Sequence, residues 1–235
     1  MKSKIVVKVG GSLLFTEENK LDKDAIQKFC QIFKMTKNIR ASIIVCGGGK
    51  IAREYINLIR SFNGNEAWCD MIGIDLSRIN SKLLISYFKD YSYPLVPKSM
   101  EELSIALLFN RIIVMGGLQP GQSTTSVALE AAEFIQADEL VILTDVKGIY
   151  DKDPKKYKDA KLLKSLTYNE LQEIILSNTS DNQAAAGEYR IFDTVSLQIL
   201  KRSKIKVRVM SGKDLSEFEK YYKGEKNVNC TLITE

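Results

Sequence analysis

Short apolar runs alternate along this chain with segments in which apolar residues recur at helical spacing. The apolar runs, which predict buried strands, lie at residues 5–7, 43–46, 112–115, 140–143 and 207–210. The segments with helical spacing lie at residues 22–35, 50–62 and 126–137. This alternation predicts an α/β fold in which helices cover both faces of a mostly parallel sheet. Between these elements, the polar stretch 151–160 predicts a loop or small hairpin, and 178–188 predicts a mobile connection.

Glycine clusters follow three of the apolar runs. They are Gly10-Gly11, Gly47-Gly48-Gly49, and Gly116-Gly117 with Gly121 shortly after. Without a Cβ, such residues let backbone N–H groups converge on an anion, and a strand, a glycine turn and a helix N-terminus together form a phosphate site. Ligands of parallel sheets bind at the carboxyl ends of the strands, where all three clusters are expected. The pattern therefore indicates one ligand with several phosphates, or two phosphorylated ligands side by side.

Composition narrows the class of protein. The chain has 235 residues, of which 45% are hydrophobic and 27% charged, as in a globular domain. Its net charge of +5 is spread along the chain with no basic stripe, which argues against a nucleic-acid partner. No apolar run approaches a membrane span or a signal peptide, so no membrane partner is expected. The four cysteines have no CxxC spacing and indicate buried thiols in a reducing, cytoplasmic compartment.

The absence of histidine is the sharpest compositional filter. With no histidine in the chain, every mechanism that uses imidazole as base, nucleophile or metal ligand is excluded. The Ser-His-Asp and Cys-His reactions are excluded with them. Lysine, arginine, aspartate, backbone N–H groups and a metal held by oxygen remain as sources of chemistry.

Several side chains near the glycine clusters are candidates for that chemistry. Lys8 ends a predicted strand, where its ammonium can lie between two phosphates and offset charge as a phosphoryl group moves. Arg53 lies one helical turn beyond the triple glycine and can fork onto phosphate oxygens, whereas Lys50 is interpreted as a solvent residue. Asp145, after the strand 140–143, can orient lysines or bind Mg²⁺ through water. Tyr150 offers a flat face to a purine.

Two other glycine-loop motifs fit this chain less well. Gly47, Gly49 and Ala52 match the dinucleotide pattern G-x-G-x-x-G/A, with Asp70 at the distance of a ribose carboxylate. That interpretation leaves Lys8 and the other two clusters unexplained. A Walker A loop fails because no glycine stands at position 44 and Ile51 follows Lys50.

Five segments together resemble the amino-acid-kinase superfamily, and within it most closely the archaeal-type uridylate kinases: 8–12, 47–53, 69–74, 115–121 and 144–154. The resemblance runs through nearly the whole chain. It implies a three-layer αβα sandwich that transfers the ATP γ-phosphoryl group to UMP with Mg²⁺, giving UDP and ADP. It also implies one domain, 1–235, with a UMP lobe at about 1–120 and an ATP lobe at 121–235. Bacterial relatives are hexamers, so a homo-hexamer is implied as well.

The resemblance also implies a role for each residue that matches a motif of the family. Lys8 and Asp145 are the implied catalytic residues, and no direct metal ligand is assigned. The ATP side is implied for Lys8, Val9, Gly10, Gly11, Ser12, Gly49, Arg53, Thr144, Tyr150 and Asp153. The UMP side is implied for Gly48, Asp70, Leu118, Gln119, Pro120, Gly121, Gln122, Ser123 and Thr124. The segment 121–125 also fits an ordinary helix N-cap.

Departures from relatives bear on the substrate. Thr125 stands where relatives often carry Asp after the Thr pair. Isopentenyl phosphate kinases share the glycine loops but place a histidine on the substrate phosphate, and this chain has none. Acetylglutamate kinase chemistry, a non-catalytic nucleotide sensor and a dinucleotide oxidoreductase remain the alternatives to UMP phosphorylation.

Overall fold

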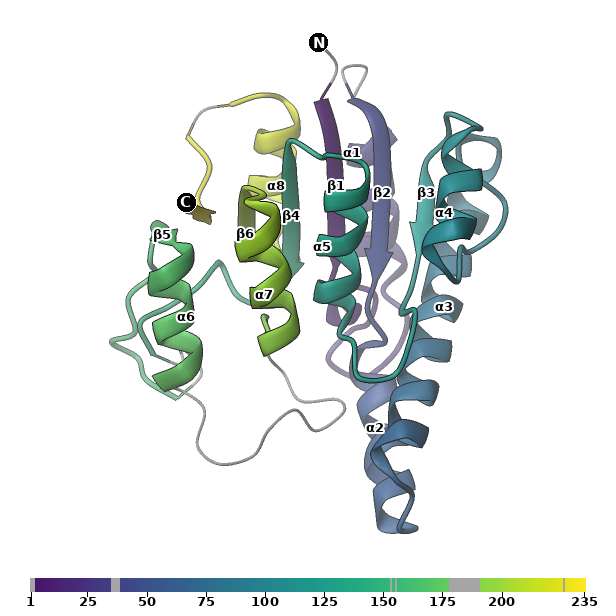
Figure 1. The fold of residues 1–235 in the computed structure, drawn as a ribbon, viewed down its shortest axis with the longest axis horizontal. Coiled ribbons are helices and arrows are strands. Elements are labelled where there is room, and N and C mark those ends of the chain that lie inside the picture. Colours follow the sequence, from purple (N-terminus) through teal and green to yellow (C-terminus); the bar gives the residue numbers. More distant parts are fainter. Residues whose placement is uncertain (1–2, 35–38, 153, 155, 178–190, 226) are drawn as a thin grey trace.

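The computed structural model describes residues 3–34, 39–152, 154, 156–177, 191–225 and 227–235. Within these residues one sheet has the strand order β3-β2-β1-β4-β6-β7-β5 (Figure 1). The strands are β1 Ser3–Val9, β2 Ile39–Cys46, β3 Ile113–Met115, β4 Glu139–Thr144, β5 Ser165–Thr167, β6 Val207–Ser211 and β7 Thr231–Thr234. Neighbours pair in parallel except β6 and β7, which are antiparallel. The mostly parallel sheet is therefore confirmed, and each of the five predicted strands is present.

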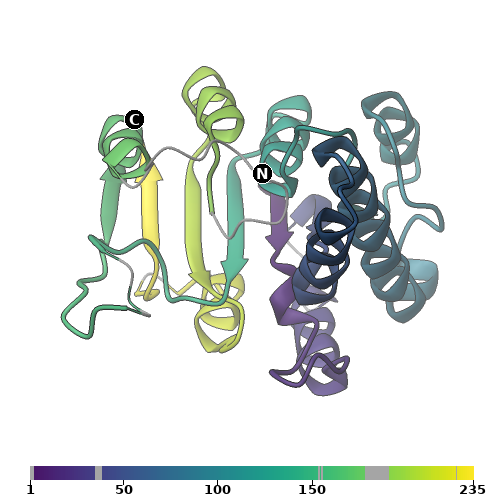
Figure 2. The ribbon, with the colours of Figure 1, turned by 90° about the horizontal axis from the view of Figure 1, so that it is seen from below.

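Helices cover both faces of the sheet, which makes three layers (Figure 2). They are α1 Lys23–Lys34, α2 Gly49–Ser61, α3 Glu66–Phe88, α4 Met100–Leu107, α5 Thr124–Phe134, α6 Tyr168–Ser177, α7 Thr194–Ser203 and α8 Ser216–Tyr222. Two short 3₁₀ turns, Gly11–Leu13 and Lys89–Tyr91, complete the set. The three helices predicted from spacing agree with α1, α2 and α5 to within three residues at each end.

The two cores show why the strands are apolar throughout. Val6 of β1 and Leu140 of β4 belong to a core cluster with residues of α4–α7 on one face, and Val7 belongs to a second cluster with residues of α1, α3 and α8 on the other. Strands buried on both sides lack the polar alternation of a half-exposed sheet. Burying apolar surface on both faces, at about 25 cal/mol per Å², anchors the strand ends that carry the glycine turns.

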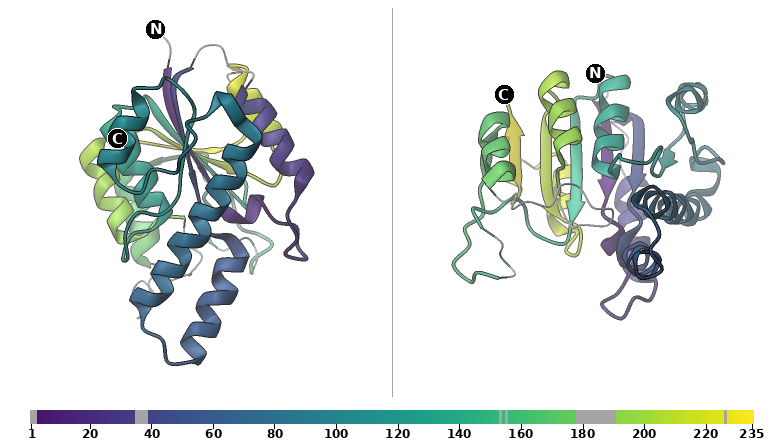
Figure 3. Two further views of the ribbon diagram at one scale, coloured as in Figure 1. Left: turned by 90° about the vertical axis from the view of Figure 1, so that its right-hand side faces the viewer. Right: turned by 60° about the horizontal axis from the view of Figure 1, so that its bottom comes forward.

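The helix α3 was not predicted, although its first turns carry the motif at 69–74. Its apolar residues do not gather on one stripe, because α3 packs on α2, α1 and the sheet together. The α2–α3 pair extends beyond the carboxyl ends of the strands (Figures 1 and 3). At the ends of the stretch 151–160, for which a loop or small hairpin was expected, Tyr150 and Leu162 form an isolated antiparallel bridge, and residues 153 and 155 within it lie outside the described residues. The expected connection at 178–188 lies outside the described residues, and the lobe boundary stays a prediction.

Candidate active site

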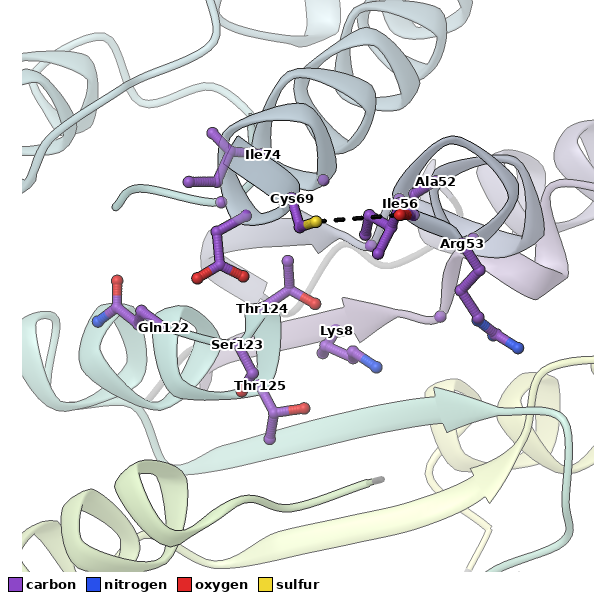
Figure 4. A pocket seen from close by; sticks show the side chains of 18 of the residues that line it. Lys8, Ala52, Arg53, Ile56, Cys69, Ile74, Gln122, Ser123, Thr124 and Thr125 are labelled. Carbon is purple, nitrogen blue, oxygen red and sulfur yellow. Dashed lines mark hydrogen bonds between the residues drawn. The ribbon is translucent and has the colours of Figure 1, made fainter. Parts of the chain in front are cut away.

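A cleft opens at the carboxyl ends of β1, β2 and β4, where α2, α3 and α5 also meet (Figure 4). It encloses about 980 Å³ of empty space, a volume that includes part of the open solvent at its mouth. Its walls come from all three glycine clusters and the helices that follow them: Lys8, Gly10, Gly11, Gly47, Gly48, Gly49, Ala52, Arg53, Ile56, Cys69, Asp70, Gly73, Ile74, Gly117, Gln122, Ser123, Thr124, Thr125 and Thr144. The predicted convergence of the clusters on one site is therefore observed.

The first two glycine turns lie back to back. A Cβ on Gly11 would stand 2.1 Å from the backbone N of Gly49, and a Cβ on Gly49 would stand 2.9 Å from the carbonyl O of Gly11. Gly49 also has a φ of +78°, a conformation that other residues adopt at a cost. Both turns extend the sheet, because Gly10 N donates to Leu143 O and Gly47 N donates to Val9 O. Glycine is required here so that two backbones can meet at the cleft.

Lys8 places a cation at the centre of the cleft. Its register partners are Val45 on β2 and Ile142 on β4, so it belongs to a central strand of the sheet. Its side chain points into the cleft (Figure 4). Desolvation by burial lowers the pKa of Lys8 to about 8, with the Asp145 carboxylate acting in the opposite direction and the Arg53 guanidinium adding to the lowering. Such a half-buried, partly desolvated amine is suited to an anionic ligand, whose charge compensates for the lost solvation.

Two helix N-termini face the cleft. The N-cap of α2 is Gly48, which offers no side chain to the first-turn N–H groups. The N-cap of α5 is Ser123, whose hydroxyl accepts from Ser126 N at 3.1 Å. Uncapped amides and the positive end of a helix dipole both favour a bound anion. The α2 end is thus the stronger phosphate candidate of the two.

Asp70 connects the helix α3 to the third glycine loop. The backbone N of Gly121 donates to Asp70 Oδ2 at 2.7 Å. Nearby, the side-chain Oε1 of Gln122 is buried without a hydrogen-bond partner among the described residues. Thr125, the residue for which the resemblance predicted a departure from relatives, is buried, and its hydroxyl donates to Ile191 O at 2.8 Å. The Thr125 hydroxyl is thus already used in a hydrogen bond to the backbone, although Thr125 forms part of the cleft wall.

Most of the predicted site residues line this cleft, but several do not. Among the described side chains and glycines of the predicted set, those outside its walls are Val9, Leu118, Gln119, Pro120, Gly121, Asp145 and Tyr150, and the side chain of Ser12 is not described. Val9 is fully buried in the core and Leu118 packs against the other core, whereas Gln119 and Pro120 are exposed. Asp145 and Tyr150 follow β4 and are half-buried. Asp153 lies outside the described residues, and all these role assignments stay predictions.

Some wall residues were not predicted. Ala52 and Ile56 flank Arg53 on α2, and Cys69, Gly73 and Ile74 belong to α3. The sequence held a signal for the α3 group, because small or polar residues recur there three or four positions apart within an apolar helix. Across the described residues, no group of three or more Cys, Asp or Glu side chains could hold a metal by itself. None of the described helices is long and apolar enough to span a bilayer.

Comparison with known proteins defines the class. Residues 3–211 match the model of the Amino acid kinase family, and the chain belongs to that family. It is 42% identical over 222 residues to a uridylate kinase of Methanobrevibacter smithii, covering 94% of this chain and 96% of the relative. It is 39% identical over 232 residues to a uridylate kinase of Sulfolobus acidocaldarius, covering 99% of this chain and 100% of the relative. The predicted superfamily and its archaeal branch are thus confirmed.

Solved structures agree on the fold. The crystal structure of uridylate kinase from Archaeoglobus fulgidus superposes with a TM-score of 0.80 at 34% identity, covering 98% of this chain and 99% of that one. The UMP kinase of Ureaplasma parvum, at 18% identity and a TM-score of 0.79 over 100% of both chains, shares the fold alone. The three-layer α/β architecture is therefore that of UMP kinases of this family.

Proposed function

We propose that this protein transfers the γ-phosphoryl group of ATP to UMP, giving ADP and UDP for pyrimidine nucleotide synthesis. The observation that carries the proposal is the position of Lys8, a half-buried cation at the point where the glycine turns and two helix N-termini meet. Its relatives named uridylate kinase support the choice of UMP. Family membership does not favour a dinucleotide oxidoreductase or a sensor.

The proposed mechanism is direct in-line transfer between two bound phosphates. The UMP phosphate is already ionised at neutral pH, so the reaction needs no general base, and a histidine-free chain can perform it. The Gly10-Gly11 and Gly47–Gly49 turns and the α2 N-terminus would hold the phosphates, and Arg53 would fork onto the ATP oxygens. Lys8 would then stabilise the charge that develops on the moving phosphoryl group. Positioning and electrostatics supply the rest of the rate.

Magnesium is proposed to enter with ATP. Mg²⁺ binds proteins through one or two carboxylates plus substrate phosphates and keeps several waters, so it needs no dedicated cage. Asp145, whose Oδ1 accepts from the Thr144 hydroxyl at 3.4 Å, fits that donor set at the end of β4. When bound, the ion would neutralise phosphate charge. Asp145 itself would orient Lys8, because its carboxylate supports the charged form of that amine.

The direct test is a panel of acceptors. ADP release is measured with UMP, CMP, acetylglutamate and isopentenyl phosphate at equal concentrations. The proposal expects UMP to give the highest kcat/KM. A preference for acetylglutamate or isopentenyl phosphate would assign another reaction of the family, and ATP binding without ADP release would indicate a sensor. NAD binding with no response to UMP would indicate an oxidoreductase.

Asp70 is proposed to hold the UMP ribose hydroxyls. Asp70→Asn keeps an oxygen that can accept from Gly121 N but removes the charge that strengthens a hydrogen bond to a ribose hydroxyl. Steady-state kinetics should therefore show a KM for UMP raised about 10-fold, as expected from losing about 1.5 kcal/mol of a charge-assisted bond, with the KM for ATP nearly unchanged. Equal increases for both substrates would place Asp70 outside the UMP site.

The unusual pKa of Lys8 predicts a pH dependence. Below a pKa of about 8 the amine of the free protein is charged, and above it the amine is neutral and cannot stabilise the transferring group. We expect kcat/KM to fall as pH rises through about 8, and bound ATP to raise the pKa of Lys8 because phosphates favour the charged form. NMR titration of labelled lysine, with Lys8→Met to assign the signal, checks both. A pKa that ATP leaves unchanged would remove Lys8 from the phosphates.

A homo-oligomer, a hexamer by resemblance, belongs to the same proposal. The protruding α2–α3 pair exposes large apolar side chains that a partner would cover: Tyr55, Leu58, Phe62, Trp68, Met71 and Ile79. Exposed apolar patches of this kind mark association surfaces. Sedimentation of the intact protein tests it, and a monomer at micromolar concentration would contradict it. A cytoplasmic location is also proposed, since ATP is supplied there and the four cysteines are buried free thiols.

A further inference from the structure

The third glycine loop, residues 116–122, is held by side chains of α3. The hydroxyl of Ser77 accepts from Gly117 N at 2.7 Å and donates to Ile74 O at 2.6 Å. The guanidinium of Arg78 donates from Nε to Gly117 O at 3.0 Å and from Nη2 to Leu118 O at 3.1 Å. Because Asp70 also accepts a hydrogen bond from Gly121 N, side chains of α3 bind both ends of the loop.

Close packing confirms that the loop and the helix form one unit. A Cβ on Gly116 would stand 2.5 Å from Ser77 Oγ, and a Cβ on Gly117 would stand 2.9 Å from Ile74 Cγ1. These glycines therefore allow the loop to lie directly on α3, which is a reason for them beyond phosphate binding. The loop leads from β3 into α5, whose N-cap, Ser123, lines the cleft.

Arg78 is the charged member of this group. Its side chain is only 19% exposed, and its nearest carboxylate, Asp75, lies 4.0 Å away on the solvent side with 66% of its side chain exposed. The planar guanidinium donates to two successive carbonyls and thereby fixes the orientation of the loop backbone. The single ammonium of a lysine could not reproduce this pair of hydrogen bonds. The cost of burying this cation is offset only while both carbonyls stay in place.

We propose that Arg78 is a positioning residue for the acceptor nucleotide: it holds the backbone of 117–118 so that the rest of the loop can bind UMP. This inference rests on the proposed function, because it takes the loop as part of the UMP site. Arg78 lies outside the cleft wall and acts through the loop alone. ATP binding is not expected to depend on this contact, because Arg78 donates to Gly117 and Leu118, whereas other residues of the cleft wall are proposed for ATP: Gly10, Gly11, Gly49, Arg53 and Thr144.

The test compares Arg78→Met and Arg78→Lys with Asp75→Asn. Both Arg78 variants should raise the KM for UMP about 10-fold or more, the effect of losing about 1.5–3 kcal/mol of charged hydrogen bonding, while the KM for ATP changes less than about twofold. Asp75→Asn removes the exposed ion pair and spares the loop, so both KM values should stay at the wild-type level. Hydrogen exchange at Gly117 and Gly121 should accelerate in the Arg78 variants only.

Different failures have different meanings. Wild-type protein with no UMP-dependent ADP release would overturn the proposed function. Two results would overturn the role of Arg78 alone, provided that the wild-type protein is active with UMP. The first is that the Arg78 variants raise the KM for UMP and the KM for ATP equally. The second is that hydrogen exchange at Gly117 and Gly121 is unchanged in these variants. Where Arg78→Met does not fold, Arg78→Lys keeps the charge and decides the question by the same KM split.

Discussion

Replacing Lys8 with alanine should lower kcat by about 10²–10³-fold or more, which is the scale of losing one preorganised electrostatic contact to a transition state. The physical reason is that the Lys8 ammonium stands where the glycine turns converge and no other described lysine lines the cleft. Stopped-time assays of UDP formation at saturating ATP and UMP measure the effect. Turnover near the wild-type level would remove Lys8 from the chemistry.

The variant is expected to stay folded. In the folded protein the pKa of Lys8 is lowered from 10.5 to about 8, so between these pH values the unfolded chain binds more protons than the folded one. The contribution of Lys8 to folding stability therefore rises with pH over this range, because the amine loses its charge and with it the penalty for burying that charge. At neutral pH that penalty is present, and removing the amine should leave thermal stability equal or higher. Lys50→Ala is the matched control, because Lys50 lies in the first turn of α2 but outside the cleft wall, with its amine 3.4 Å from Glu17 O. Its kcat should change less than about threefold.

Replacing Gly11 with alanine should be the most damaging small substitution. The new Cβ would stand 2.1 Å from Gly49 N and 2.8 Å from Gly47 O, and neither backbone atom can move without displacing the α2 N-terminus. Overpacking of this kind costs about 1–3 kcal/mol of stability. A displacement of about 1 Å at the phosphate-binding turns can cost about 100-fold in rate. Thermal unfolding and UDP formation are measured together.

Gly224→Ala separates the clash from the general cost of losing a glycine. Gly224 has a φ of +79° and no atom within 4 Å of an added Cβ, so its substitution should cost about 1–2 kcal/mol of stability with turnover unchanged. Wild-type turnover in Gly11→Ala would show that the two turns need not meet for catalysis.

The strands β1, β2, β3, β4 and β6 and three of the helices could be predicted because burial on one or both faces determines the pattern of apolar residues in the sequence. Apolar runs marked the strands, and a one-sided stripe marked α1, α2 and α5. The helix α3 could not be found in this way, since it packs on several sides and its apolar positions follow no single stripe. The strands β5 and β7 could not be predicted because their residues are not all buried, so neither forms a continuous apolar run, whereas the similarly short β3 is buried throughout.

The site residues could be predicted where a sequence pattern is typical of one kind of binding. A lysine at a strand end beside two glycines, and a triple glycine before a helix, are both typical of phosphate binding. Contacts made by backbone atoms could not be predicted, because the sequence does not say that Gly11 faces Gly49 or that Arg78 reaches two carbonyls of a loop 39 and 40 positions away. Such pairings arise only when the sheet brings distant turns to one edge.

In the proposed mechanism, a phosphoryl group passes in one step between two nucleotides held in this cleft. The most direct measurement uses ATP made chiral at its γ-phosphorus with oxygen isotopes and determines the configuration of the β-phosphorus in the UDP that forms. Single in-line transfer predicts inversion. Retention of configuration would show a covalent enzyme intermediate and contradict direct transfer.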